Sequence, residues 1–140
     1  NTKKTFIASL FYTLNKSDYD KVRSAIKTIN LENKKNFTAK KLSHGEKQWL
    51  EIGMLLMQEP DLLLIDEPVA GMTEFETSNT AALLKNIAKK RTVLVVEHDM
   101  KFVESLDVEI VVLHEGAVLT RGNMNSIKKN KQVIDVYLGR

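Results

Sequence analysis

Ionisable side chains follow two apolar runs of the sequence, and their types suit phosphate and metal chemistry. Asp66 and Glu67 come directly after LLLI, and His98 follows TVLVVE. A carboxylate such as that of Asp66 suits Mg²⁺, which keeps several waters and takes one or two carboxylates together with phosphate oxygens. Glu67 points the other way along an extended chain, where it would polarise an attacking water as a general base, an effect of roughly 10²–10⁴-fold. A histidine beside these carboxylates would bond a phosphate oxygen.

The segment LSHGEKQ, residues 42–48, has the pattern of a helix start that binds an anion. Ser43 and Glu46 form the S-x-x-E pattern of a capping box. Gly45 lets a phosphate approach the backbone closely, and the free N–H groups and dipole of a helix N-terminus favour negative charge. The candidate phosphate-binding residues are therefore Ser43, His44, Gly45 and Glu46.

Each of these patterns also has a plainer interpretation. Asp66-Glu67-Pro68 fits a turn that merely ends a strand. A single histidine such as His98 is often structural, and LSHGEKQ fits an ordinary capped helix. The occurrence of all three patterns in order along one chain favours a phosphate site over three unrelated structural roles.

Two regions of different character would position these residues. Residues 1–41 are polar, rich in Lys and Asn, and are predicted to be helical. One helix there would begin at a capping box of Ser17 and Asp20. Its apolar stripe, at spacings i, i+3, i+4 and i+7, consists of Val22, Ala25, Ile26 and Ile29.

From residue 42 onward the pattern alternates between helices and short apolar strands. The first part of the predicted order is a helix to about Gln58 that ends before Pro60, a strand at 62–66, a helix capped by Thr73 and Glu76, and a strand at 92–96. A short helix near 100–105 follows, then a strand at 109–114, which a hairpin turn at Glu115-Gly116 joins to AVLTRG (117–122). Two short helices end the chain, and the last stops at Gly139. This alternation predicts an α/β fold with buried strands in an open parallel sheet. Ligands bind beyond the carboxyl ends of such strands, which is where Asp66, Glu67 and His98 fall.

Composition limits the class of protein further. With 43% apolar and 28% charged residues, the chain has the make-up of a globular domain rather than a disordered one. The net charge of +3 is modest and no aromatic residues interleave the basic clusters, so we expect no nucleic-acid partner. No cysteine is present for a disulfide or thiolate metal site. No apolar run approaches the ~20 residues that span a bilayer, so any link to a membrane would run through a partner.

Four motifs in order resemble those of ABC ATPases. LSHGEKQ is similar to the family's signature motif, usually LSGGQ, and LLLIDEP to its Walker B strand with the catalytic glutamate. AGMT (70–73) stands at the D-loop, and VVEHDM contains the switch histidine. The likeness covers roughly residues 42–140. Within the family, DEPVAGMT, EHDM and the terminal YLG resemble the branched-chain amino-acid uptake group, and LSHGEKQWLEIGMLLMQEP looks most like a urea-importer ATPase.

The resemblance implies a P-loop NTPase-like α/β fold and a role for each motif. Residues 1–58 would form the helical signature subdomain and residues 59–140 the C-terminal part of the RecA-like core. Asp66 would act on Mg²⁺ through water, Glu67 would polarise the attacking water, and His98 would contact the γ-phosphate of ATP. Ser43, His44, Gly45 and Glu46 would bind the γ-phosphate of ATP held mainly by a second subunit. The D-loop residues Ala70, Gly71, Met72 and Thr73 would lie at the dimer interface. The sequence departs from the usual pattern at His44 (usually Gly), Glu46 (Gln) and Thr73 (often Asp).

One family motif has no counterpart in this sequence. A phosphate-binding loop of the form G-x-x-x-x-G-K-[ST] needs a Gly-Lys pair, and none of the 6 glycines is followed by lysine. We therefore expect the chain to be the C-terminal part of a longer ATPase, and to bind and hydrolyse ATP negligibly by itself.

The resemblance implies an importer subunit as the function. The full-length protein would be an ATPase on the cytoplasmic face of the membrane, a peripheral subunit that dimerises with a second ATP-binding subunit. Its other partners would be transmembrane permeases and, indirectly, an extracytoplasmic solute-binding protein. The substrate would be a small polar solute of the urea or branched-chain amino-acid type. The alternatives are an ABC-type ATPase of DNA repair or chromosome organisation, and an inert module that binds a partner.

Overall fold

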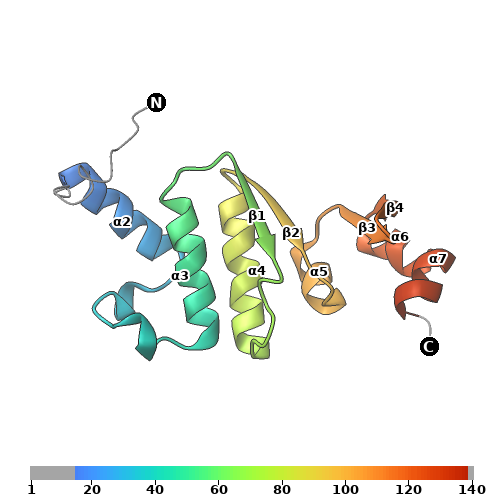
Figure 1. Cartoon of the computed structure of the whole chain (residues 1–140), viewed down its shortest axis with the longest axis horizontal. Coiled ribbons are helices and arrows are strands. Elements are labelled where there is room, and N and C mark those ends of the chain that lie inside the picture. Colours follow the sequence, from blue (N-terminus) through green and yellow to red (C-terminus); the bar gives the residue numbers. More distant parts are fainter. Residues whose placement is uncertain (1–14, 139–140) are drawn as a thin grey trace. The chain divides into compact units, whose positions relative to one another are not determined.

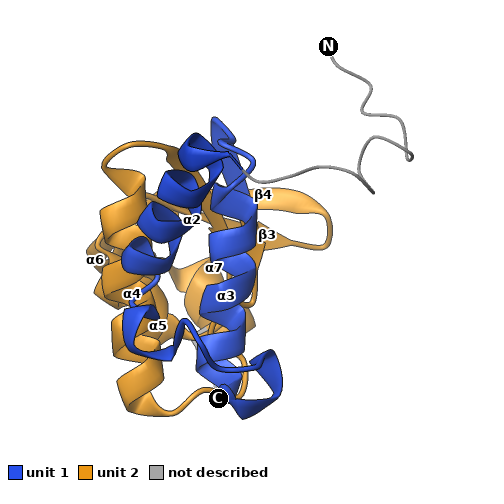
Figure 2. Ribbon diagram, turned by 90° about the vertical axis from the view of Figure 1, so that its left-hand side faces the viewer, with its two compact units in different colours: residues 1–63 blue, residues 64–140 orange. Residues whose placement is uncertain are grey.

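The computed structural model describes residues 15–138 of the chain. The chain divides into two units, residues 1–63 and 64–140, which Figure 2 colours separately. Within the described range, no helix combines the length and the hydropathy that a bilayer crossing requires.

The first unit is helical. Its elements are α2 (Lys16–Thr28), two 3₁₀ turns η1 (Glu32–Lys34) and η2 (Ala39–Lys41), and α3 (His44–Leu56) (Figure 1). The helices α2 and α3 pack together where α3 carries a glycine. A Cβ atom on Gly53 would lie 2.7 Å from Cδ1 of Ile29, so the missing side chain is what allows the close approach. Ile29, Trp49 and Ile52 are buried in this small core.

The start of α2 differs from the prediction. Asn15, not Ser17, is the N-cap, and its side chain accepts a hydrogen bond from the N–H of Asp18 at 3.0 Å, while Asp18 accepts one from the N–H of Asn15. Asn15-x-x-Asp18 and Ser17-x-x-Asp20 are equivalent patterns two residues apart, and the earlier one adds two residues to the helix. The prediction of helix throughout residues 1–41 was also wrong between residues 31 and 41, which hold only the two 3₁₀ turns. Residues 1–14 lie outside the described part of the chain.

The second unit follows the predicted order of elements. After β1 (Leu62–Asp66), which crosses the boundary between the units, come α4 (Glu74–Ala88), β2 (Thr92–Val96), α5 (Met100–Leu106), β3 (Ile110–His114), β4 (Ala117–Gly122), α6 (Met124–Lys129), α7 (Lys131–Val133) and a π-helical segment, η3 (Ile134–Leu138). The predicted helix at 131–138 is therefore three α-helical residues followed by a π-helix. The predicted stop at Gly139 lies outside the described residues.

Strand pairing is only partly as predicted. β1 and β2 are neighbours in one sheet, and the N–H of Glu67 after β1 donates to the carbonyl of Val96 at the end of β2, so the carboxyl ends of the two strands lie together, as in a parallel pair. β3 pairs with β4 across the Glu115-Gly116 turn, which confirms the predicted hairpin, but this antiparallel pair is a separate sheet and does not extend the one formed by β1 and β2. Pairing across the Glu115-Gly116 turn is local, with φ of 48° and 78° at the two turn residues, whereas a parallel partner requires a longer crossover.

The strands β1 and β2 are covered on one face only. Leu63 and Ile65 of β1 are buried, whereas Leu64 is 64% exposed. The helix α4 packs against β2 on the covered side. The buried residues of α4 are Thr80, Ala81, Leu83, Leu84 and Ile87. The prediction of strands buried on both faces was wrong for the described residues, because burial depends on a second covering layer that the apolar composition of a strand cannot reveal.

Candidate functional site

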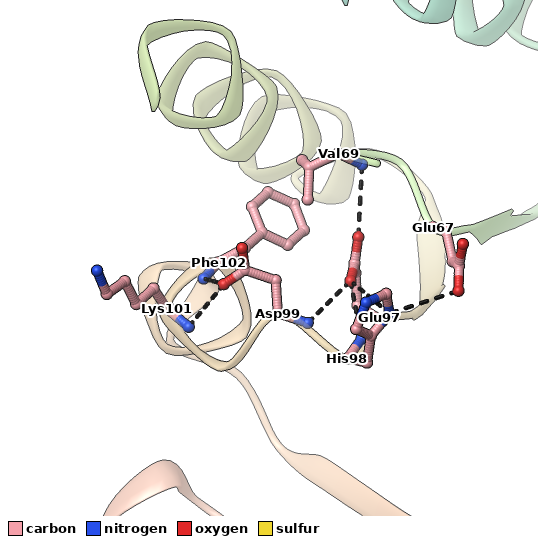
Figure 3. A network of polar contacts seen from close by, with 7 residues as sticks. All are labelled: Glu67, Val69, Glu97, His98, Asp99, Lys101 and Phe102. Carbon is pink, nitrogen blue, oxygen red and sulfur yellow. Dashed lines mark hydrogen bonds and ion pairs between the residues drawn. The ribbon is translucent and has the colours of Figure 1, made fainter. Parts of the chain in front are cut away.

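The ends of β1 and β2 bring Glu67 and His98 together. Backbone hydrogen bonding joins the two strand ends, since the N–H of Glu67 donates to the carbonyl oxygen of Val96 at 2.9 Å. The Nδ1 atom of His98 then lies 3.4 Å from Oε1 of Glu67 (Figure 3). Both side chains remain accessible, with 77% of His98 and 55% of Glu67 exposed. A carboxylate and an imidazole in this position can share a proton or hold a common polar ligand.

The backbone at Glu67 adopts an unusual conformation. Its φ of 45° lies in the left-handed region, which costs a residue with a Cβ atom roughly 1–2 kcal/mol. Non-glycine residues in this region cluster at functional sites because the surrounding structure must hold them there. Here the next turn is closed by a hydrogen bond from the N–H of Ala70 to the carbonyl of Glu67 at 3.3 Å.

Glu97 is a site residue whose role the sequence interpretation missed. Its side chain is only 2% exposed. One carboxylate oxygen accepts hydrogen bonds from the N–H groups of His98 at 2.7 Å and Asp99 at 3.0 Å, and the other accepts from the N–H of Val69 at 3.4 Å (Figure 3). The available signal was its position after an apolar run, the same signal that singled out Glu67.

Asp99 and Phe102 fix the segment that follows His98. Oδ1 of Asp99 accepts hydrogen bonds from the N–H groups of Lys101 at 2.9 Å and Phe102 at 3.0 Å, which makes it the N-cap of α5. The side chain of Phe102 is almost fully buried. The polar cap and the apolar anchor together hold the beginning of α5 against the rest of the unit.

Asp66 ends β1 with an exposed carboxylate. Within residues 15–138, no three His, Cys, Asp or Glu side chains cluster as a metal site would require. This donor set does not fit a cation held by protein ligands alone. It fits a Mg²⁺ ion that keeps its waters and takes most of its other ligands from phosphate oxygens.

The loop of residues 70–73 is hydrogen-bonded to the helix that follows it. The side chain of Thr73 accepts a hydrogen bond from the N–H of Glu76 at 3.3 Å, and Glu76 accepts one from the N–H of Thr73 at 3.1 Å, which is the predicted capping box. Gly71 has a φ of 70°, a conformation that glycine adopts without strain. The Oγ1 hydroxyl of the fully buried Thr80 lies 3.3 Å from the sulfur of Met72 and also donates to the carbonyl of Glu76 at 2.8 Å.

The segment Ser43–Glu46 belongs to the first unit and begins α3 as predicted. Ser43 is the N-cap, with its Oγ accepting from the N–H of Glu46 at 3.3 Å and Glu46 Oε2 accepting from the N–H of Ser43 at 3.0 Å. The second carboxylate oxygen of Glu46 lies 2.5 Å from Nζ of Lys34. His44 is exposed in the first turn, and Gly45 is buried. Glu46 therefore stabilises the start of the helix and ties it to the 3₁₀ turn that contains Lys34.

Comparison with known proteins agrees with the motifs and the fold. The family model described as "ABC transporter" matches residues 2–70. The branched-chain amino acid transport ATP-binding protein BraF of Pseudomonas aeruginosa is 37% identical over 141 residues, 96% of this chain and 55% of its own length. LivG of Escherichia coli, a protein with the same description, is 33% identical over 86% of this chain and 48% of its own length.

The solved structures extend the likeness to three dimensions. The ADP conformation of MJ1267, an ATP-binding cassette of an ABC transporter, superimposes with a TM-score of 0.79 and 25% identity over 96% of this chain and 57% of that one. The predicted α/β class of an ABC ATPase is confirmed by this match. The chain spans about half the length of the curated relatives it matches.

Proposed function

Because this chain belongs to the ABC transporter ATPase family, we propose that it forms part of the ATP-binding subunit of an importer. The observation that carries the proposal is the placement of His98 Nδ1 3.4 Å from Glu67 Oε1 where β1 and β2 end. Such a pair suits the hydrolysis of a phosphoanhydride, because it offers a base for water and a hydrogen-bonding group for a phosphate oxygen on the same side of the sheet.

In the proposed site each residue has one task. Glu67 accepts a proton from the attacking water and orients it, and His98 bonds an oxygen of the terminal phosphate while its ring rests against Glu67. Asp66 would hold, through water, the Mg²⁺ ion that accompanies ATP. When bound, that ion would neutralise the charge that develops on the phosphate oxygens. Ala70, Gly71, Met72 and Thr73 form a rigid loop that faces a second subunit.

We assign Ser43, His44, Gly45 and Glu46 to the terminal phosphate of an ATP molecule held mainly by that second subunit. The assignment rests on the resemblance of LSHGEKQ to the family's signature motif and on the N-terminus of α3, whose dipole favours an anion. Glu46 takes part indirectly, because its two oxygens hold the N–H of Ser43 and the ammonium group of Lys34. Residues 1–58 would then be the signature subdomain and residues 59–140 part of the catalytic core.

The partners and the substrate follow from the relatives. We propose that permease subunits anchor the protein to the cytoplasmic side of a membrane, and that a solute-binding protein delivers the substrate to them. BraF and LivG are described as branched-chain amino acid transport proteins, which makes leucine, isoleucine and valine the first substrates to test. Urea remains a second candidate substrate because the run LSHGEKQWLEIGMLLMQEP resembles the ATPases of urea importers. Uptake of labelled leucine and of labelled urea by cells with and without the gene distinguishes the two.

Nucleotide binding tests the proposal that this chain supplies only part of the ATP site. A helix N-terminus contributes about 0.3–1 kcal/mol toward an anion, whereas even millimolar affinity requires about 4 kcal/mol. The 140-residue chain, which has no Gly-Lys pair, should therefore show no saturable ATP binding below ~1 mM in calorimetric titration. The full-length protein should bind ATP and hydrolyse it. A micromolar constant for the 140-residue chain would contradict the proposal that the phosphate loop lies elsewhere.

A further inference from the structure

Glu97 connects the two loops that carry the proposed catalytic pair. Its carboxylate accepts from the N–H of Val69, which lies two residues after Glu67, and from the N–H groups of His98 and Asp99. The three donors come from two segments 28 residues apart in sequence. One buried side chain thus bonds to the backbone on both sides of the pair (Figure 3).

Because Glu97 is buried, its carboxylate depends on these hydrogen bonds for stabilisation. The side chain of Glu97 is 2% exposed, and no lysine or arginine in residues 15–138 forms an ion pair with it. A charge in such a place depends on the hydrogen bonds that it accepts, and bonds to a carboxylate are stronger than neutral ones. The arrangement therefore favours a single geometry of the two loops over looser alternatives.

The same geometry sets the Glu67–His98 distance. Glu67 is held from one side by its own N–H bond to Val96 and from the other by the bond between Val69 and Glu97. The Nδ1 atom of His98 lies 3.4 Å from Oε1 of Glu67 and 3.7 Å from Oε2 of Glu97. Because Glu67 has a strained backbone, releasing Val69 would let it relax away from His98.

We propose that Glu97 is a positioning residue that holds the loop after β1 and His98 in the one arrangement where Glu67 and His98 act together. The inference rests on the proposed ATPase function. Glu97 acts through the backbone of its neighbours and has no part in contacting the nucleotide.

Replacement of Glu97 by glutamine tests this role in the full-length protein. The amide oxygen of the E97Q variant can still accept from His98 and Asp99, but its NH₂ group cannot accept from Val69, so only the link between the loops is lost. We expect kcat for ATP hydrolysis to fall about 10- to 100-fold, the scale of a misplaced catalytic group, with KM for ATP changed less than about 3-fold. The matched control is Glu104→Gln, an exposed carboxylate paired with Lys128, which should leave both constants at wild-type values.

A double-variant comparison separates positioning from a general structural effect. In a His98→Ala background the pair no longer exists, so adding Glu97→Gln should lower kcat by less than about 2-fold, because groups that act as a unit are not additive. A merely structural role would multiply the two losses and would overturn the proposal.

Hydrogen exchange gives a readout that does not depend on activity. The amide of Val69 should exchange about 10-fold faster or more in the Glu97→Gln variant, while Asp99 stays protected. Equal exchange at Val69 in both proteins would overturn the proposed link.

If the glutamine variant does not fold, Glu97→Asp replaces it as the test. This variant keeps the charge, but its carboxylate is one methylene too short to reach both loops, so an unchanged kcat would also overturn the proposed role of Glu97. Wild-type protein without ATP turnover would overturn the proposed function, whereas wild-type turnover with a fully active E97Q variant would overturn only the role of Glu97.

Discussion

Glu67 and Glu97 occupy matching positions, each one residue beyond the end of a strand, and the two strands are neighbours in one sheet. Their environments are nevertheless opposite. The side chain of Glu67 is 55% exposed, and its Oε1 atom lies 3.4 Å from Nδ1 of His98. The side chain of Glu97 is 2% exposed and accepts three backbone hydrogen bonds. Solvent water can reach the carboxylate of Glu67, whereas the carboxylate of Glu97 is bonded to the backbone of two loops.

This difference separates two ways in which a strand end serves a site. A group that performs chemistry needs access to substrate and some freedom from fixed partners. A group that positions its neighbours needs the reverse, because its hydrogen bonds are strong only where water is excluded. The comparison predicts that loss of the Glu67 carboxylate lowers the rate with little effect on stability, whereas loss of the Glu97 carboxylate lowers both.

The largest expected effect is on turnover at Glu67. In the full-length protein, Glu67→Gln should keep ATP binding and lower the rate of hydrolysis by roughly 10²–10⁴-fold, since the amide cannot take a proton from water. Phosphate release and nucleotide titration measure the two properties. Undiminished hydrolysis would remove the general-base role from Glu67.

The next effect is on stability and distinguishes Glu97 from Glu67. Glu97→Ala leaves three backbone N–H groups without their acceptor, and we expect a loss of about 2–4 kcal/mol in the free energy of unfolding. The matched Glu67→Ala variant should lose less than about 0.5 kcal/mol because its side chain is largely exposed. Urea unfolding followed by circular dichroism gives both values. Equal losses of unfolding free energy at the two positions would contradict the proposed difference between Glu67 and Glu97.

A smaller effect concerns the strained backbone of Glu67. Glu67→Gly should raise the free energy of unfolding by about 0.5–1 kcal/mol, because glycine adopts the left-handed region without the cost of a Cβ atom. The hydrolysis rate should fall at the same time. Glu115 in the β3–β4 turn has a similar φ of 48° and supplies the control. Glu115→Gly should give the same gain without a change in turnover; a destabilised Glu67→Gly variant would argue against stored strain.

The smallest effect is at the exposed pair of Lys128 and Glu104, whose Nζ and Oε1 atoms lie 2.6 Å apart. Exposed ion pairs contribute little, so Glu104→Gln should change the free energy of unfolding by less than about 0.5 kcal/mol. Thermal unfolding of this variant beside Glu97→Gln compares two glutamates that differ chiefly in burial. A large loss at Glu104 would mean that burial is not what separates them.

Several features were predictable because they are local. The capping boxes of Ser43 with Glu46 and of Thr73 with Glu76 lie within one turn of helix, and the Glu115-Gly116 turn joins adjacent residues. Where two local patterns competed, as at the start of α2, the prediction was displaced by two residues. The pairing of β3 with β4 alone, and the exposure of Leu64, depend on distant parts of the chain, and sequence patterns did not reveal them.

The amino-acid sequence is enough to identify the candidates for chemistry: an acidic pair after one apolar run, a histidine after the next, and a capped helix start rich in phosphate-compatible groups. Residue type and spacing decide these properties, because they follow from pleat, helix period and side-chain chemistry. Only the folded chain shows that Glu67 is exposed and Glu97 buried, and that His98 lies against the first of them. The two strand ends meet through hydrogen bonds between residues about thirty positions apart, such as that from Val69 to Glu97, and no local pattern specifies those bonds.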